Sequence, residues 1–173
     1  AGIANDPSVE LNETLSWNIN VLATRQLIEK AVKNKVKKFI YASSGSVYGI
    51  KKEKKVTEKL SLKPISLYNK VKMCTERIIL SYKNQIEIFI VRPATVCGYS
   101  PRMRFDISVN ALTISGLLKN KIIVHGGSQV RPNIHIDDIT DLYVYFLNVN
   151  KKFAGIYNAG FENMSIKKIS EII

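Results

Sequence analysis

A tyrosine and a lysine four residues apart, Tyr68 and Lys72, form the pair of side chains with the clearest potential for chemistry in this sequence. On a helix, this spacing places both side chains on one face, about 5–6 Å apart. With an effective dielectric constant of about 20, the lysine charge at that distance stabilises a phenolate by roughly 3 kcal/mol. Such a phenolate can accept the proton of a substrate hydroxyl while hydride leaves the same carbon.

The same spacing occurs a second time, at Tyr48 and Lys52. That pair leads out of a glycine-bounded turn into a run of charged residues, where helical geometry is not expected. We therefore prefer Tyr68 and Lys72, whose segment has helical periodicity. An ordinary surface pair on a helix remains the alternative interpretation, because the spacing by itself is common.

Three serines, Ser43, Ser44 and Ser46, follow the apolar segment FIYA at residues 39–42. In open α/β sheets, ligands lie beyond the carboxyl ends of the strands. If residues 39–42 end a strand, the serine hydroxyls lie where a ligand binds. Ser44 is then placed to hold the oxygen of a substrate whose proton Tyr68 removes.

These side chains need a scaffold of alternating helices and strands. Apolar residues recur at helical spacing in residues 13–33 and from Ser66, a predicted N-cap, to about residue 82. Strands are predicted at residues 35–42, 86–91, 122–124, 130–136 and 155–159, and further helices at residues 107–119, from Asp137 or Asp138 to residue 148, and from Ser165 onward. Residues 50–65 read as a surface loop. The alternation favours parallel pairing in a doubly wound α/β sheet.

The formal net charge of +12 raises the possibility of nucleic-acid binding. The lysines, however, are scattered in short pairs such as Lys37-Lys38 and Lys51-Lys52, without interleaved aromatic residues. This pattern favours a solvated surface, so we expect no nucleic-acid partner.

Neither a metal site nor a membrane segment is indicated. Cys74, Cys97, His125 and His135 lack the spacing of metal ligands. The sequence contains no apolar run long enough to span a bilayer and no signal-peptide layout at residue 1. We therefore expect a cytoplasmic protein with reduced, structural cysteines.

Five segments together resemble the extended short-chain dehydrogenase/reductases, and within them the NAD-dependent sugar-nucleotide epimerase/dehydratase family. They are NxNVLAT at residues 18–24, VKKFIYASSGSVYG at 36–49, SLYNKVK at 66–72, VRPATVCGYSP at 91–101 and GGSQVRPNIHIDD at 126–138. The resemblance extends over the whole chain. It implies that residues 1–95 are the C-terminal half of an NAD-binding Rossmann domain, and that residues 96–173 are a smaller substrate-binding lobe mixed with returning Rossmann elements.

The resemblance also assigns roles to residues. It implies that Tyr68 is the catalytic base, that Ser44 hydrogen-bonds the reacting sugar oxygen, and that Lys72 promotes the phenolate and holds the nicotinamide ribose. The implied cofactor contacts are Ala1, Gly2, Asn20, Ala42, Tyr68, Lys72 and Pro93; the implied substrate contacts are Ser44, Ser46, Thr95, Asn110 and Arg131. Arg131 would clamp the diphosphate of a nucleoside-diphosphate sugar, a task that suits a planar and permanently charged group.

The residues after the catalytic serine bear on the reaction. Dehydratases of this family carry an acidic residue there, whereas this chain has Gly45 and Ser46. Neither can remove a proton from carbon. We therefore expect an epimerase that removes hydride transiently, at C4 of the sugar. A sugar-nucleotide 4-ketoreductase or dehydrogenase and a non-catalytic dinucleotide-binding remnant are the alternatives.

The family's GxxGxxG turn is not found in these 173 residues, and Gly126-Gly127 does not lead from a strand into a helix. We expect the turn to precede residue 1 and the chain to be truncated at its C-terminus, so the fragment alone should be inactive and bind NAD poorly. NAD is the expected cofactor and NADP is the alternative. The resemblance further suggests a homodimer, formed through the helices around Trp17 and Leu67.

Overall fold

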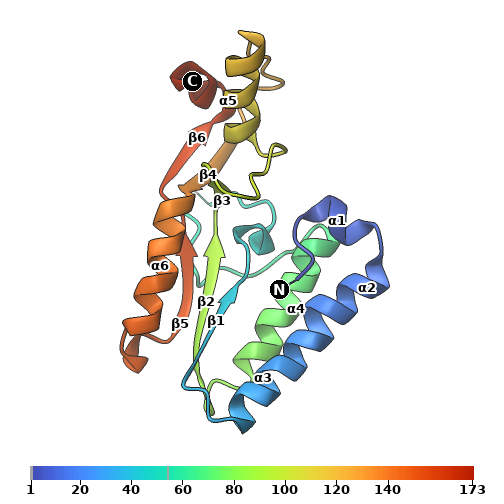
Figure 1. Ribbon diagram of the computed structural model, residues 1–173, viewed down its shortest axis with the longest axis vertical. Helices are drawn as coiled ribbons and strands as arrows, with labels where there is room; N and C mark the ends of the chain where they lie inside the picture. Colours follow the sequence, from blue (N-terminus) through green and yellow to red (C-terminus); the bar gives the residue numbers. More distant parts are fainter. Residues whose placement is uncertain (1, 54) are drawn as a thin grey trace. The chain divides into compact units, whose positions relative to one another are not determined.

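The computed structural model describes residues 2–53 and 55–173 (Figure 1). The chain forms two compact units, one of Ala1–Arg92 and Tyr145–Asn158, the other of Pro93–Val144 and Ala159–Ile173. Ala1, a predicted cofactor contact, lies outside the described residues. The predicted domain boundary at residue 95 concerns the domains of the whole protein and stays a prediction.

The first unit is built on a sheet of three strands in the order β1-β2-β5. These strands are β1 (Lys38–Ala42), β2 (Glu87–Pro93) and β5 (Gly155–Ala159). β1 and β2 are parallel, with Phe39 opposite Ile88 and Ala42 opposite Val91. The predicted strands at 86–91 and 155–159 are thus confirmed, while the first strand begins at Lys38 rather than at residue 35. Lys35 has a positive φ of 55°, which ends the preceding helical turn and is incompatible with an extended strand.

Helices cover both faces of this sheet. Ile88 and Ile90 of β2 form a buried cluster with Ile28 of α3 (Ala23–Lys33) and Ile79 of α4 (Leu67–Leu80). The two helices lie side by side on this face (Figure 1). Side chains alternate along a strand, so Phe89 points to the opposite face. There it packs against Phe146, near the end of α6 (Ile136–Asn148), at a centroid distance of 5.0 Å. The prediction of a doubly wound α/β sheet is confirmed.

The predicted helix at residues 13–33 is interrupted. It consists of α2 (Glu13–Trp17), a π-helical turn η1 (Asn18–Leu22) and α3, and it follows a short helix, α1 (Asp6–Glu10). The apolar periodicity of the segment did not indicate the wider turn. A π-helical turn widens to hold its additional residue, so the apolar side chains before and after it stay on nearly the same face of the helix.

The predicted N-cap of α4 is confirmed. The Ser66 hydroxyl accepts the N–H of Asn69 at 3.2 Å, which satisfies one of the unpaired donors of the first turn. The helix ends at Leu80, two residues before the predicted end. Between β1 and α4, a 3-10 turn η2 (Gly45–Tyr48) follows the strand directly.

The second unit holds a sheet in the order β3-β4-β6. β3 (Thr95–Cys97) is parallel to β4 (Val130–His135), and β6 (Glu162–Ser165) is antiparallel to β4. The unit also contains α5 (Ser108–Lys119), α7 (Ile166–Ile172) and most of α6, while the turn η3 (Lys151–Phe153) belongs to the first unit. None of the helices formed by residues 2–53 and 55–173 is long and apolar enough to cross a membrane.

Two expectations for this unit are wrong. Residues 122–124 form no strand, because the short apolar run IIV follows the end of α5 without a neighbouring strand to pair with. α6 begins at Ile136, so Asp137 and Asp138 lie in its first turn rather than at its cap. Their carboxylates still complement the positive end of the helix dipole.

Lys38, the first residue of β1, closes the C-terminal end of α6. Its ammonium donates to the carbonyl oxygens of Phe146 at 2.7 Å, Leu147 at 2.9 Å and Val149 at 2.9 Å. Carbonyls at a helix C-terminus have no partner within the helix and carry partial negative charge, so a cation is favoured there.

We predict that Lys38→Met lowers the free energy of unfolding by about 2 kcal/mol, because the methionine keeps the apolar stem and loses charge-assisted hydrogen bonds. Urea unfolding followed by circular dichroism measures the change. The matched control is Lys37→Met at the exposed neighbouring position, which should change the stability by less than about 0.5 kcal/mol. Equal effects of the two substitutions would contradict the proposed capping role.

Candidate functional site

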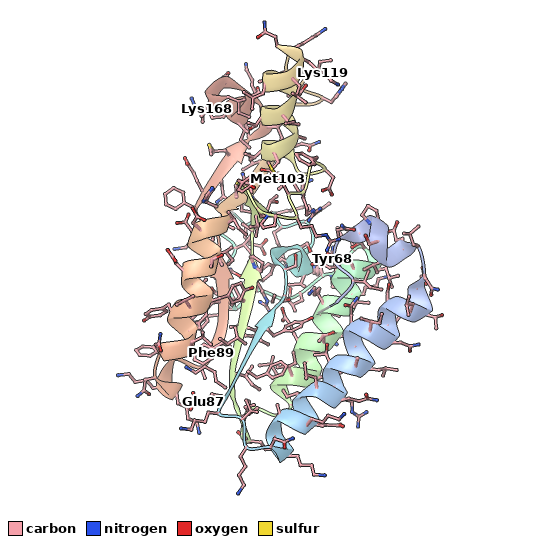
Figure 2. All side chains as sticks on the ribbon, viewed as in Figure 1. Tyr68, Glu87, Phe89, Met103, Lys119 and Lys168 are labelled. Carbon is pink, nitrogen blue, oxygen red and sulfur yellow. The ribbon has the colours of Figure 1, made fainter. Side chains whose placement is uncertain are left out.

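Ser44, Tyr68 and Lys72 come from two neighbouring elements. Ser44 follows the carboxyl end of β1, and Tyr68 and Lys72 lie in the first two turns of α4, with Tyr68 near its start (Figure 2). The Lys72 ammonium donates to the carbonyl of Ala42, the last residue of β1, at 2.7 Å. It also lies 5.6 Å from the centroid of the Tyr68 ring. One lysine therefore connects the strand end to the tyrosine.

The surroundings of Lys72 disfavour its charged form. Its ammonium lies 5.0 Å from the Tyr41 ring on β1, and the side chain is partly enclosed. Burial lowers the pKa of Lys72 from 10.5 to about 8, and the nearby carboxylate of Glu76 opposes this shift. Lys72 is therefore mostly charged at pH 7 and loses its proton as the pH rises through about 8.

Ser44 is held by the turn that follows it. As the N-cap of η2, its hydroxyl oxygen accepts the N–H of Ser46 at 3.2 Å. The two hydroxyl oxygens lie 2.7 Å apart, and the Ser46 hydroxyl in turn donates to the side-chain oxygen of Asn69. Asn69 directly follows Tyr68 on α4. The sequence analysis did not single it out, and its only signal there is its place inside SLYNKVK.

Two predicted cofactor contacts, Gly2 and Asn20, lie next to each other. The Asn20 side chain accepts the N–H of Ile3 at 3.0 Å and donates to the carbonyl of Ile3 at 3.1 Å. A Cβ atom at position 2 would lie 2.7 Å from the Asn20 oxygen, so a larger residue there would displace the Asn20 amide from Ile3. Asn20 therefore fixes the backbone around residue 3.

The π-helical turn that carries Asn20 is joined to α4. The fully buried Thr75 hydroxyl shares its one hydrogen between the Val71 carbonyl at 2.8 Å and the Asn20 carbonyl at 3.1 Å. π-helical turns are rare and occur frequently at functional sites. The cofactor role of Gly2 and Asn20 stays a prediction.

A buried ion pair lies beneath the site. Glu76 on α4 and Arg92 on β2 form two hydrogen bonds, of 3.0 Å to Arg92 Nε and 2.6 Å to Arg92 Nη2, and both side chains are nearly inaccessible. The Ser43 hydroxyl donates to the same carboxylate. Arg92 Nη1 donates to the Tyr48 hydroxyl at 2.7 Å. The pair therefore joins α4 to the ends of two strands and to η2.

The hydrogen bonds continue from Tyr48 toward the loop before α4. The Tyr48 hydroxyl donates to the side-chain oxygen of Asn158 at 2.8 Å. The backbone N–H of Asn158 donates to Glu58 at 2.7 Å, and its side-chain amide donates to the Val56 carbonyl at 3.1 Å. Tyr48 is thus buried in a 3-10 turn that ends at it, and it does not form a helical pair with Lys52.

The predicted substrate contacts of the second unit have different surroundings. Thr95 begins β3, and Arg131 lies exposed on β4. Asn110 is buried: its oxygen accepts the N–H of Gly98 at 3.0 Å, and its amide donates to the Arg104 carbonyl at 2.9 Å. Asn110 therefore fixes the segment before α5. Pro93 ends β2. The substrate and cofactor roles of these residues stay predictions.

Among residues 2–53 and 55–173, no group of three or more His, Cys, Asp or Glu side chains is arranged to hold a metal ion. The polar groups gathered at the end of β1 are hydroxyls, an amide and one lysine. This set can bind hydroxyl or carbonyl oxygens and can move a proton.

We predict that the Lys72 ammonium titrates with a midpoint of about 8 in the ligand-free protein, measured by NMR of the lysine side chains, and that Lys72→Met removes this titration. Because the folded pKa lies below the ordinary 10.5, the protonated form carries a cost. The contribution of Lys72 to stability should therefore become more favourable as the pH rises from about 8 to about 10.5. A midpoint near 10.5 would contradict the burial argument.

Comparison with known proteins connects this chain to a family. The sequence model of the NAD dependent epimerase/dehydratase family matches residues 1–160. An uncharacterised UDP-glucose epimerase of Bacillus subtilis is 32% identical over 158 residues, which cover 89% of this chain and 49% of that protein. Human dTDP-D-glucose 4,6-dehydratase is 30% identical over 159 residues, covering 90% of this chain and 45% of the enzyme.

A solved structure gives the same relationship. The UDP-glucuronic acid 4-epimerase of Bacillus cereus, in complex with UDP-glucuronic acid and NAD, is 36% identical with a TM-score of 0.74. The match covers 87% of this chain and 49% of that one. The chain spans about half the length of the curated relatives it matches.

Proposed function

The chain belongs to the NAD dependent epimerase/dehydratase family, and on this basis we propose that the whole protein is an NAD-dependent epimerase of nucleoside-diphosphate sugars. The reaction removes hydride from a sugar carbon, C4 in our proposal, and returns it to the opposite face. The observation that carries the proposal is the position of the Lys72 ammonium, which bonds to the Ala42 carbonyl and lies beside the Tyr68 ring, at the strand end that Ser44 follows.

The residues at this strand end have complementary roles in such a reaction. Tyr68 takes the proton of the sugar hydroxyl, and the charge of Lys72 stabilises the phenolate form that accepts it. Ser44 hydrogen-bonds the reacting oxygen. When bound, NAD supplies the hydride acceptor.

The local donors fit the nicotinamide end of NAD. An ammonium carries three hydrogens, and the bond from Lys72 to Ala42 uses one, which leaves donors for ribose hydroxyls. Gly2 is exposed and has no side chain, a property that lets a backbone approach a dinucleotide closely. The complex of the Bacillus cereus enzyme with NAD supports this cofactor, and NADP is the alternative.

The choice of epimerase over dehydratase rests on the residues after Ser44. Gly45 has no side chain, and the Ser46 hydroxyl donates to Asn69, so neither supplies a base for elimination of water. A sugar-nucleotide 4-ketoreductase or dehydrogenase needs the same proton and hydride transfer and is the second candidate. The proposed contact with the diphosphate of the substrate is the exposed guanidinium of Arg131.

We predict that Tyr68→Phe in the full-length product of the gene lowers the rate of hydride transfer from UDP-glucose at least about 100-fold, because the general base is lost. The absorbance of reduced nicotinamide after rapid mixing measures this rate. The affinity for NAD, measured by calorimetry, should change little. The matched control is Tyr145→Phe at an exposed position of α6, which should leave the rate unchanged. An unchanged rate in Tyr68→Phe would favour the non-catalytic alternative.

The proposed partner is a second copy of the chain. Leu15 on α2 and Leu22 on η1 are large apolar side chains with exposed fractions of 46% and 51%, on the helices for which the resemblance suggested dimer contacts. Exposed apolar side chains that gather on neighbouring helices are typical of a protein interface.

We predict that Leu15→Glu/Leu22→Glu converts the full-length protein from a dimer to a monomer in light scattering, since charges would be buried without partners. Leu118→Glu on α5, where the side chain is even more exposed at 77%, is the control and should leave the dimer intact. A double variant that remains dimeric would place the interface elsewhere.

A further inference from the structure

The side chains of Ser44, Ser46 and Asn69 form a hydrogen-bonded row. Asn69, at the end of the row, determines which hydroxyl donates in each hydrogen bond. Asn69 is 8% exposed, and its side-chain oxygen accepts the hydrogen of the Ser46 hydroxyl. An amide oxygen accepts hydrogen bonds and cannot donate them. The single hydrogen of Ser46 is therefore used.

The direction of the next bond follows. The hydroxyl oxygens of Ser44 and Ser46 lie 2.7 Å apart, and either could donate on distance alone. Because the Ser46 hydrogen is directed to Asn69, the hydrogen in this contact must come from Ser44. The Ser44 oxygen also accepts the N–H of Ser46 at 3.2 Å, which uses one of its two lone pairs. One lone pair remains. The Ser44 hydroxyl can therefore accept a hydrogen bond from a substrate but has no hydrogen left to donate to one.

This polarity matters for the proposed reaction, on which the inference rests. In the forward step the C–H bond breaks with both electrons going to the nicotinamide, the hydroxyl proton passes to the Tyr68 phenolate, and a carbonyl forms. The alcohol can donate to the lone pair of Ser44. The carbonyl oxygen of the ketone carries no hydrogen and can only accept a hydrogen bond. To donate to the ketone, Ser44 must therefore break its own hydrogen bond to Ser46.

We propose that Ser46 and Asn69 are positioning residues that hold Ser44 as a hydrogen-bond acceptor and thereby disfavour the bound ketone relative to the bound alcohol. Holding the ketone costs the bond from Ser44 to Ser46. An enzyme that must return its hydride benefits from this bias, because the ketone intermediate is then short-lived. Asn69 and Ser46 act through Ser44 and do not themselves need to touch the reacting atoms.

The test measures the on-enzyme equilibrium between NAD with alcohol and NADH with ketone. Full-length protein loaded with NAD is mixed with saturating UDP-glucose, and the fraction of reduced nicotinamide at equilibrium is read from its absorbance. Asn69→Leu frees the hydrogen of Ser46, and Ser46→Ala removes the acceptor of Ser44. Each variant should raise the ratio of reduced to oxidised cofactor about tenfold, the effect expected for one hydrogen bond of about 1.4 kcal/mol.

Three further variants separate this role from a merely structural one. The double variant Asn69→Leu/Ser46→Ala should give no larger change than either single variant, because both interrupt the same row. Ser46→Thr keeps the hydroxyl and should return the ratio to within about twofold of the unaltered protein. Ser81→Ala, which removes the Ser81 hydroxyl that bonds to Ile78 at the end of the same helix, is the control and should leave the ratio unchanged.

A binding measurement gives a readout independent of turnover. In the Tyr68→Phe background, calorimetry compares UDP-glucose with its 4-deoxy-4-fluoro analogue, which cannot donate a hydrogen bond at C4. The intact row should favour UDP-glucose about tenfold, and Ser46→Ala or Asn69→Leu should reduce this preference to about twofold or less.

The outcomes distinguish the two proposals. If the unaltered protein neither binds UDP-glucose nor reduces its cofactor with it, the proposed function is wrong for this substrate. If it does both, and the variants leave the equilibrium ratio and the binding preference within twofold, the inference about Ser46 and Asn69 is overturned. A loss of fold would lower the affinities for both ligands together and would not raise the ratio of reduced cofactor.

Discussion

The buried ion pair between Glu76 and Arg92 is the interaction on which the candidate site depends. Each charge has been removed from water, at a cost that only close pairing and further hydrogen bonds can offset. The two bonds within the pair, the hydroxyl of Ser43 and the hydroxyl of Tyr48 supply this compensation. Loss of one partner would leave an uncompensated charge, at a cost of about 3–5 kcal/mol. The arrangement of α4, β1, β2 and η2 is therefore fixed as one unit.

The pair also determines how α4 presents its functional side chains. Tyr68, Lys72 and Glu76 follow each other at intervals of four residues and share one face of the helix. Glu76 holds that face of α4 against the sheet. Tyr68 and Lys72, which lie on the same face nearer the start of the helix, are therefore placed at the end of the strand. The carboxylate also acts through space, because it opposes the effect of burial on the pKa of Lys72. A single side chain thus contributes to both the geometry and the charge of the site.

The features that could be predicted from the sequence have strong local signals. The apolar runs of β1, β2 and β5, the periodicity of α4 and the Ser66 cap each depend on neighbouring residues, and the structure confirms them. The alternation of helices and strands predicted the α/β sheet, and the family resemblance identified it as a Rossmann fold. From the predicted end of β1 and the spacing of Tyr68 and Lys72, the sequence predicted that Ser44, Tyr68 and Lys72 lie near one another.

The features that were missed depend on residues far apart in the sequence. β3 and β6 are three and four residues long and exist only because β4 lies between them. The partners Glu76 and Arg92 lie on different elements, α4 and β2, and nothing in the sequence near Arg92 distinguishes it from a surface arginine. The bond between Ser46 and Asn69 spans the whole loop before α4. Such contacts arise from topology, which local patterns do not specify.

The π-helical turn η1 makes the first unit sensitive to the length of its N-terminal segment. Such a turn contains one residue more than the α-helical turns around it. A deletion of one residue between Asn18 and Leu22 would allow a continuous α-helix, in which each residue advances by about 100° around the axis. The helices on either side would keep nearly the same orientation, because the wider turn already accommodates the additional residue, whereas Asn20 inside the turn would change direction and lose its alignment with Ile3. The segment should therefore accept substitutions on its exposed side more readily than insertions or deletions.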